Sequence, residues 1–233
     1  MLRAKTVWFK KEGERPAGEI ATVLASTIWR LADKAVDNLS KANFDIVTPQ
    51  RGFKIIGELS CFLVHYVDRL AFERMDDGKR QELVSATGVR LAEIMEQNIL
   101  DMNGGRKDPD YDYQDGYIDL LNRRMNDYAE FEFPQDKASF QALRFLSLMI
   151  REGMEKTDQS WIQDQLMDIE LPEMMGMVKK NMDGFYPPAP PPPPPHPAPP
   201  RRRNPRPAGC KGWMGRVFYV HSRGCPLLPN PPT

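Results

Sequence analysis

Histidine and cysteine are scarce in this chain of 233 residues, which contains three of each. Only Cys61 and His65 lie within the first 183 residues, and the residue three positions before His65 is Phe62. Zinc sites need several such ligands, and di-iron helical bundles need a Glu-x-x-His motif on two helices. The cysteines also lack a C-x-x-C spacing. The sequence therefore predicts no metal site, no cofactor and no disulfide framework.

Long apolar runs and familiar catalytic motifs are also missing. The sequence has no stretch of about 18 apolar residues, so it predicts no transmembrane helix. No apolar segment follows the basic residues of 1–5, so it predicts no secretory signal. The 32 basic and 32 acidic residues balance, which argues against a nucleic-acid binder that is basic throughout. A Walker loop, a G-x-G-x-x-G turn, a G-x-S-x-G elbow and an H-E-x-x-H helix are absent. We expect a cytoplasmic protein without a membrane segment.

Proline is scarce up to residue 183 and abundant after it. Of the 22 prolines, 17 lie in 184–233, together with seven basic residues and no acidic one. The first 183 residues consequently carry 25 basic and 32 acidic side chains, so an acidic body precedes a basic tail. We expect an N-terminal arm at 1–16, a helical domain at 17–183 and a disordered Pro/Arg-rich tail at 184–233. For that tail, a spacer, a ligand of proline-binding domains and a non-native reading frame remain alternatives.

Helical periodicity organises the acidic body. Apolar residues recur at three- and four-residue spacing in six segments, which Gly, Pro or Asp residues separate. The segments are 19–43, 51–75, 79–102, 115–130, 137–152 and 158–180. Pro172 and Gly176 lie in the last segment, which we expect to be kinked or split. No segment alternates with a period of two residues. The sequence thus predicts an all-α fold, a bundle of five to six helices with segment 51–75 at its centre.

Segment 51–75 carries a polar arc opposite its apolar one. On a helical projection this arc contains Lys54 and the five candidate binding residues Glu58, Cys61, His65, Asp68 and Arg69. We expect the arc to face water or a second copy of the chain, with its charges pairing across a twofold axis. One alternative is that Glu58, His65 and Asp68 bind a metal or relay protons. A nucleophilic Cys61 beside His65 is another.

Two further clusters have a structural and a functional interpretation. The acidic loop 108–116 has aspartates at alternate positions like a calcium-binding loop, but Tyr113 stands where such a loop needs glycine. We expect these acids to cap the helix that follows.

Methionines gather near the end of the body, among them Met174, Met175 and Met177. We expect them to fill an irregular core, with a partner-binding groove as the alternative if they are exposed together.

The scarcity of catalytic signals favours a non-enzymatic helical protein. We expect it to act through self-association, as a homodimer, or by binding another protein through an amphipathic helix surface. The competing interpretation is a helical-bundle enzyme, or a protein that binds a small ligand or metal, with the Glu/His/Asp cluster as its site. We expect no specific nucleic-acid partner because the body is acidic and has no short helix rich in Arg, Asn and Gln.

Overall fold

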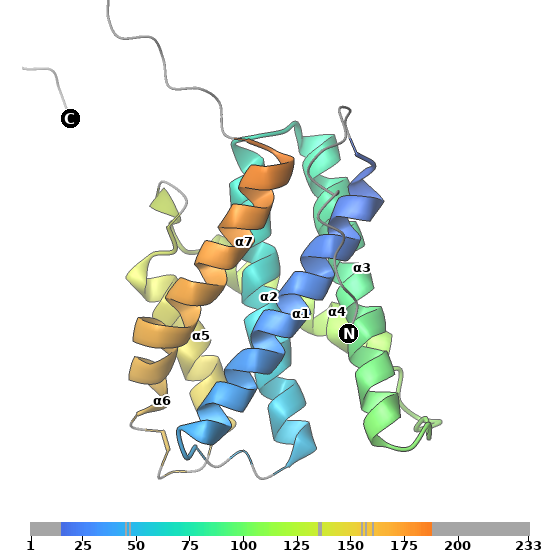
Figure 1. The fold of residues 1–233 in the computed structure, drawn as a ribbon, viewed down its shortest axis with the longest axis vertical. Coiled ribbons are helices and arrows are strands. Elements are labelled where there is room, and N and C mark those ends of the chain that lie inside the picture. Colours follow the sequence, from blue (N-terminus) through green and yellow to red (C-terminus); the bar gives the residue numbers. More distant parts are fainter. Residues whose placement is uncertain are drawn as a thin grey trace, which may run out of the picture. The chain divides into compact units, whose positions relative to one another are not determined.

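A computed structural model of the chain describes residues 15–187, except 45, 47, 135, 136, 155, 157 and 160. Its regular elements are helices α1 (Ala17–Lys41), α2 (Pro49–Phe72), α3 (Asp77–Met102), α4 (Tyr113–Ala129), α5 (Phe140–Arg151), α6 (Ile162–Asp164), the π-helical turn η3 (Gln165–Glu170) and α7 (Leu171–Phe185). No strand occurs within the described ranges, so the predicted all-α bundle is confirmed. Figure 1 shows the arrangement.

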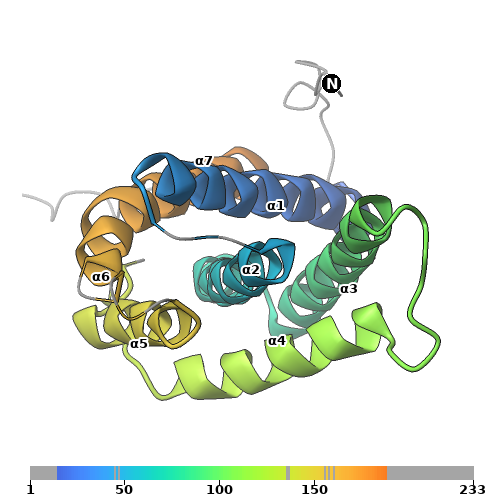
Figure 2. The ribbon, with the colours of Figure 1, turned by 90° about the horizontal axis from the view of Figure 1, so that it is seen from below.

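Helix α2 forms the centre of the bundle. It contacts α1, α3, α4, α5 and α7, and Figure 2 shows these helices around it. Of its 24 residues, 16 are buried, and they lie on every side of the helix. A helix that is apolar over a broad arc and covered all round belongs to a core rather than a surface. The central position predicted for segment 51–75 is therefore confirmed.

Short polar side chains cap the first turns of α2, α3 and α4. The Thr48 hydroxyl accepts a hydrogen bond from the Arg51 amide before α2, and the Asp76 carboxylate accepts one from the Lys79 amide before α3. Asp112 of the acidic loop accepts bonds from two amides in the first turn of α4. Each cap satisfies N–H groups that have no partner within the helix. The loop 108–116 thus caps a helix, as predicted.

The last helix changes its winding before Pro172. Helix α6 continues without a break through the π-helical turn into α7, in which Pro172 is the second residue. A proline ring displaces the carbonyl four residues earlier, and a π turn is one way to accommodate that displacement. The buried Glu170 at the end of this turn accepts bonds from the side-chain amides of Asn38 (3.1 Å) and Gln165 (3.2 Å). The predicted interruption of segment 158–180 is this π turn.

Helix α4 lies close against α2 and α3 because glycines face it. A Cβ atom built on Gly88 of α3 would lie 2.6 Å from Leu121 Cδ2, and one built on Gly57 of α2 would lie 3.2 Å from Leu120 Cδ2. Both distances are shorter than an ordinary contact, so a larger residue at either position would force the leucine side chain that faces it to move. This close approach brings α4 over the residue next to Gly57, which is Glu58.

Several sequence-based predictions concern residues that the structure does not describe. The arm predicted at 1–16 falls outside the described residues except for Arg15 and Pro16. The tail predicted at 184–233 falls outside them after Pro187, and its first two residues belong to α7. No helix in the described ranges is long and apolar enough to cross a membrane.

Candidate functional site

The predicted polar arc of α2 does not face water over most of its length. Glu58, Cys61 and His65 are all buried, with exposed fractions of 3% or less. Helix α4 and the segment after it cover this side of α2, while α1 and α7 cover the other side (Figure 2). The prediction that these three residues form a solvated face or a dimer surface is therefore wrong. Their polar groups instead lie inside the chain, where some have hydrogen-bond partners and others have none.

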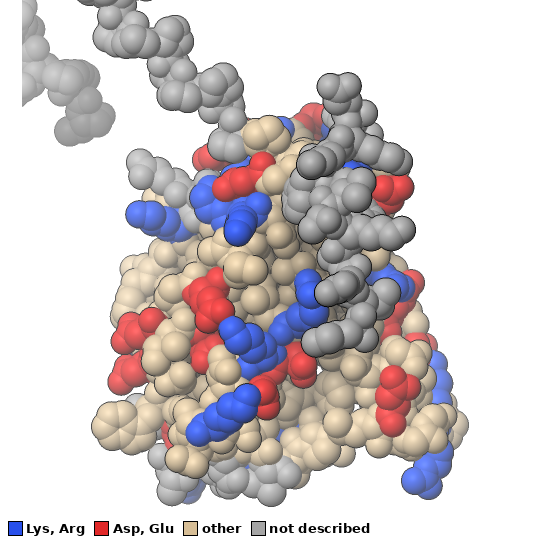
Figure 3. All heavy atoms as spheres, in the orientation of Figure 1, with Lys and Arg blue, Asp and Glu red and all other residues tan. Residues whose placement is uncertain are grey.

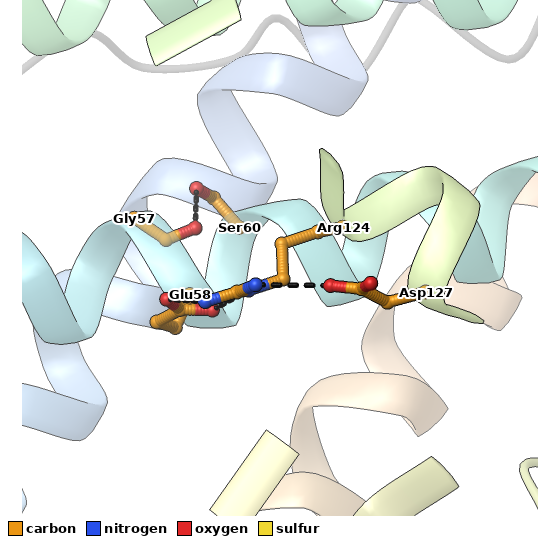
Figure 4. Close-up of polar contacts among 5 residues, drawn as sticks. All are labelled: Gly57, Glu58, Ser60, Arg124 and Asp127. Atoms are coloured by element: carbon orange, nitrogen blue, oxygen red, sulfur yellow. Dashed lines mark hydrogen bonds and ion pairs between the residues drawn. The ribbon is translucent and has the colours of Figure 1, made fainter. Parts of the chain in front are cut away.

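Glu58 is held by an arginine from α4. Its two carboxylate oxygens accept hydrogen bonds from Arg124 Nε (2.6 Å) and Nη2 (2.7 Å), while Arg124 Nη1 donates to Asp127 Oδ2 at 2.9 Å (Figure 4). The Glu58 contact raises the pKa of Arg124 further above its ordinary value. A bidentate pair of this kind uses both carboxylate oxygens of Glu58. Glu58 therefore has the environment of a structural ion pair rather than of a general base.

His65 lies against two aromatic rings. Its ring lies 4.9 Å from that of Phe133 and 5.5 Å from that of Tyr128, measured between centroids. Neither ring nitrogen of His65 has a hydrogen-bond partner among the described residues, and the Tyr128 hydroxyl also has none. Burial, with a smaller effect from the charge of Arg69, lowers the pKa of His65 from 6.5 to about 4. The imidazole is therefore neutral at physiological pH.

Cys61 is a buried thiol rather than an activated nucleophile. Burial, and then the negative charge of Glu58, raises its pKa well above the ordinary value. A nucleophilic cysteine needs the opposite shift, because the thiolate is the reactive form. Beside it, the hydroxyls of Ser60 and Tyr117 share a hydrogen bond of 3.0 Å and link α2 to α4. Cys61 and the two hydroxyls beside it therefore belong to the core between α2 and α4.

Asp68 and Arg69 belong to a different environment near the C-terminal end of α2. Asp68 Oδ1 lies 3.6 Å from Arg80 Nη1 on α3, and burial raises the pKa of the Asp68 carboxyl. The guanidinium groups of Arg69 and Arg80 lie 4.8 Å and 5.1 Å from the centroid of the exposed Phe72 ring. The five candidate residues consequently separate into a buried set under α4 and a partly exposed set against α3.

Metal coordination has no support from this arrangement. In the parts of the chain that the structure describes, no three His, Cys, Asp or Glu side chains lie together in a way that could hold an ion. Glu58 is bound by Arg124, and Asp68 pairs with Arg80. The alternative in which Glu58, His65 and Asp68 jointly bind a metal is therefore contradicted for these residues.

Three of the seven methionines between 149 and 182 are core residues. Met154, Met174 and Met182 are buried, whereas Met175 is half-buried and Met177 is 43% exposed. Core filling, the preferred prediction, holds for the first three. The condition for a groove formed by Met174, Met175 and Met177 together is not met, because Met174 faces the interior.

A groove nevertheless lies beside Met175. It encloses about 400 Å³ and is lined by Tyr66, Lys137, Ala138, Leu143, Leu171, Pro172, Met175 and Lys179. Tyr66 and Leu171 are buried at the groove, the segment before α5 and α5 itself supply one wall, and α7 supplies the other. The described residues that line it are all apolar or aromatic except the two lysines. We call it the α5–α7 groove.

The face formed by α1 and α7 differs from this groove in charge. Lys34 Nζ on α1 lies 2.7 Å from Glu173 Oε1 on α7, and Lys41 lies 2.7 Å from Asp37 on the same helix. Figure 3 shows acidic and basic side chains mixed over this face. The mixture leaves no large area of one sign there.

Comparison with models of protein families, with curated proteins and with solved structures found no match to this chain.

Proposed function

We propose that this helical protein binds another protein, and that the α5–α7 groove holds an acidic amphipathic helix of that partner. The observation that carries the proposal is an apolar groove of about 400 Å³ with one lysine on each wall, Lys137 and Lys179. Apolar floors with a charged rim are typical of surfaces that bind a helix by its apolar face. The geometry and the charge of the groove each support this proposal.

The spacing along α7 fits a helical ligand. Pro172, Met175 and Lys179 are separated by three and four residues, so they lie along one side of α7. Seven residues of helix span about 10 Å, which is close to two turns. A ligand helix that presents apolar side chains at i, i+3 or i+4 and i+7 covers the same length. Met175 adds an adaptable side chain to that surface.

Charge favours an acidic ligand. Lys137 is exposed at one rim of the groove, and Lys179 at the other lies 3.6 Å from Asp183 Oδ1 in its own helix. The Lys179 side chain is 38% exposed and the Asp183 side chain 37% exposed. Asp183 Oδ1 also lies 2.8 Å from Arg74 Nη1, so it keeps a cationic partner when Lys179 turns toward an acidic group of a ligand.

The same helices present other apolar side chains to solvent. Phe140 at the start of α5, Trp161 before α6, Ile169 in η3 and Met177 in α7 are each between 43% and 68% exposed. Single exposed apolar residues are normal on a protein surface, but aromatic residues and methionine are enriched where proteins bind one another. Among the described residues, the other four large apolar side chains that are exposed lie between 72 and 111, so this part of the chain is one of two that carry such surface.

Selection from a random peptide library tests the proposal without a known partner. The full chain is used as bait with displayed peptides of about 16 residues, which is enough for roughly four helical turns. We expect the selected peptides to share apolar residues at helical spacing flanked by Asp or Glu. Their binding should weaken about tenfold with the double variant K137E/K179E, a change of about 1.4 kcal/mol.

The matched control is K180E, which removes a lysine one position further along α7 that does not line the groove. Its effect on peptide binding should stay within about twofold. Selected peptides that are basic, or that bind the double variant and the wild type equally, contradict the proposal. Light scattering tests whether a second copy of the chain occupies the groove. A wild-type dimer that dissociates in the variant K137E/K179E means that a second copy fills the groove.

The organisation and location of the chain also remain proposals. We propose that 17–183 acts as the binding domain, with an arm at 1–16 and a basic tail at 184–233, and the abrupt change in proline content supports this division. We also propose a cytoplasmic location, since the three cysteines form no disulfide pattern in the sequence.

A further inference from the structure

A second cavity lies between three helices at the opposite end of α2. It encloses about 430 Å³ between α1, the first two turns of α2 and the end of α3. Figure 2 views the molecule from the end at which α2 begins. Pockets that bind small molecules measure about 300–1,000 Å³ and combine apolar walls with a few polar groups. This cavity has that size and that composition.

Two aromatic rings form part of the wall. Trp29 of α1 and Phe53 of α2 are both half-buried, and their ring centroids lie 6.4 Å apart with an angle of 37° between the planes. Met102, which is 57% exposed, completes the apolar lining from the end of α3. Aromatic faces carry partial negative charge and attract cations, with tryptophan the strongest of them. The wall can therefore contact a positively charged group as well as an apolar one.

The carboxylate and the side-chain amide of the cavity have oxygens that can still accept a hydrogen bond. Asp33 makes no ion pair or hydrogen bond with any residue that the structure describes, although its neighbours Lys34 and Asp37 are both paired. Asn98 donates through Nδ2 to a backbone oxygen at 2.8 Å, which leaves its carbonyl oxygen available. Among the described residues that line the cavity there is no lysine or arginine, and the one formal charge they supply is negative.

We propose that this cavity binds an organic ammonium cation with an apolar body. The carboxylate of Asp33 supplies the opposite charge, the Trp29 and Phe53 rings contact the cationic carbons, and the apolar lining takes the remainder of the ligand. An anion would be repelled by Asp33 with no compensating cation. A neutral apolar molecule would gain no electrostatic attraction from the carboxylate. The cavity is separate from the α5–α7 groove, so the two sites can be tested independently.

Benzyltrimethylammonium is a suitable probe because it joins an aromatic ring to a permanent cation. It is titrated into the full chain and followed by the indole N–H NMR signal of Trp29, identified by its loss in W29F. We expect a saturable shift with a Kd of about 1 mM for a ligand of this size. Asp33→Asn, which keeps the shape of the side chain and removes its charge, should weaken binding about fivefold.

Asp37→Asn is the matched control, since Asp37 lies one helical turn further along α1 and does not line this cavity. It should change the Kd by less than about twofold. Benzyl alcohol, which has a similar ring and no charge, should bind about fivefold more weakly than the cation. The proposal is overturned if neither compound binds, if both bind equally, if the two variants behave alike, or if saturation leaves the Trp29 signal unmoved.

Discussion

At the scale of single residues, the environment of His65 decides its chemistry. The imidazole is surrounded by aromatic rings and has no hydrogen-bond partner among the described residues, so its neutral form is favoured. The same side chain on an exposed helix would titrate near its ordinary pKa. A helical projection cannot distinguish these cases, because it shows which residues share a side of a helix and not what packs against that side.

This buried histidine predicts a specific loss of stability in acid. The unfolded chain binds a proton at His65 below a pKa of 6.5, whereas the folded chain binds it only below about 4. As the pH falls between these values the unfolded state gains more protons, so the free energy of unfolding decreases, by about 3 kcal/mol in full. Urea denaturation of the wild type and of His65→Phe at several pH values measures this difference.

The comparison with His65→Phe removes the contribution of the carboxylates, which also lose favourable contacts in acid. We expect the wild type to lose about 3 kcal/mol more than the variant between about pH 7.5 and pH 4. Parallel pH profiles for the two proteins would mean that the imidazole is not buried in its neutral form.

The pair of Glu58 and Arg124 predicts a large effect of removing one partner. Arg124→Met leaves the Glu58 carboxylate buried without a cation, and we expect the free energy of unfolding to fall by about 2–3 kcal/mol. This is less than for a fully buried pair, since the Arg124 side chain keeps 17% exposure. In the double variant E58M/R124M no buried charge remains there, so it should be more stable than R124M alone. A double variant less stable than R124M contradicts the ion-pair account.

At the scale of elements, periodicity predicted the helices well and their ends less well. Segments 51–75 and 79–102 match α2 and α3 closely, and Pro49, Asp76 and the glycines at 104 and 105 explain this. The sequence predicts that α5 starts at 137, but the helix begins at Phe140 because Ser139 caps it by accepting a bond from the Ala142 amide. A serine within a polar stretch does not stand out until the helix beside it is known.

The cap of α4 gives a prediction at this scale. Asp112 accepts hydrogen bonds from the Gln114 amide at 3.0 Å and the Asp115 amide at 3.1 Å, so Asp112→Ala should lower the Tm by about 2–4 °C. The control is Asp110→Ala in the same loop, whose side chain caps no helix. Differential scanning calorimetry of the two variants measures the effect. Equal Tm values for both would show that the cap contributes nothing to α4.

At the scale of the whole molecule, the two proposed binding sites lie where distant segments meet. The α5–α7 groove joins residues from 66 to 179, and the cavity with Trp29 joins residues from 29 to 102. Neither the groove nor the cavity can be recognised from the sequence of one segment, because each segment contributes only a few residues at helical spacing. The covering of α2 by α4 was hidden for the same reason: it depends on Gly57, Gly88 and Arg124, which lie on three helices.

The methionine side chains offer the most direct test of the central claim, that the α5–α7 groove binds an acidic amphipathic helix. The chain contains 13 methionines, and their methyl groups can be labelled with ¹³C and observed by NMR. Addition of a selected acidic peptide should shift the methyl signal of Met175 most, while the buried Met95 and Met154 remain in place. Saturable peptide binding that leaves the Met175 signal unchanged would contradict the account.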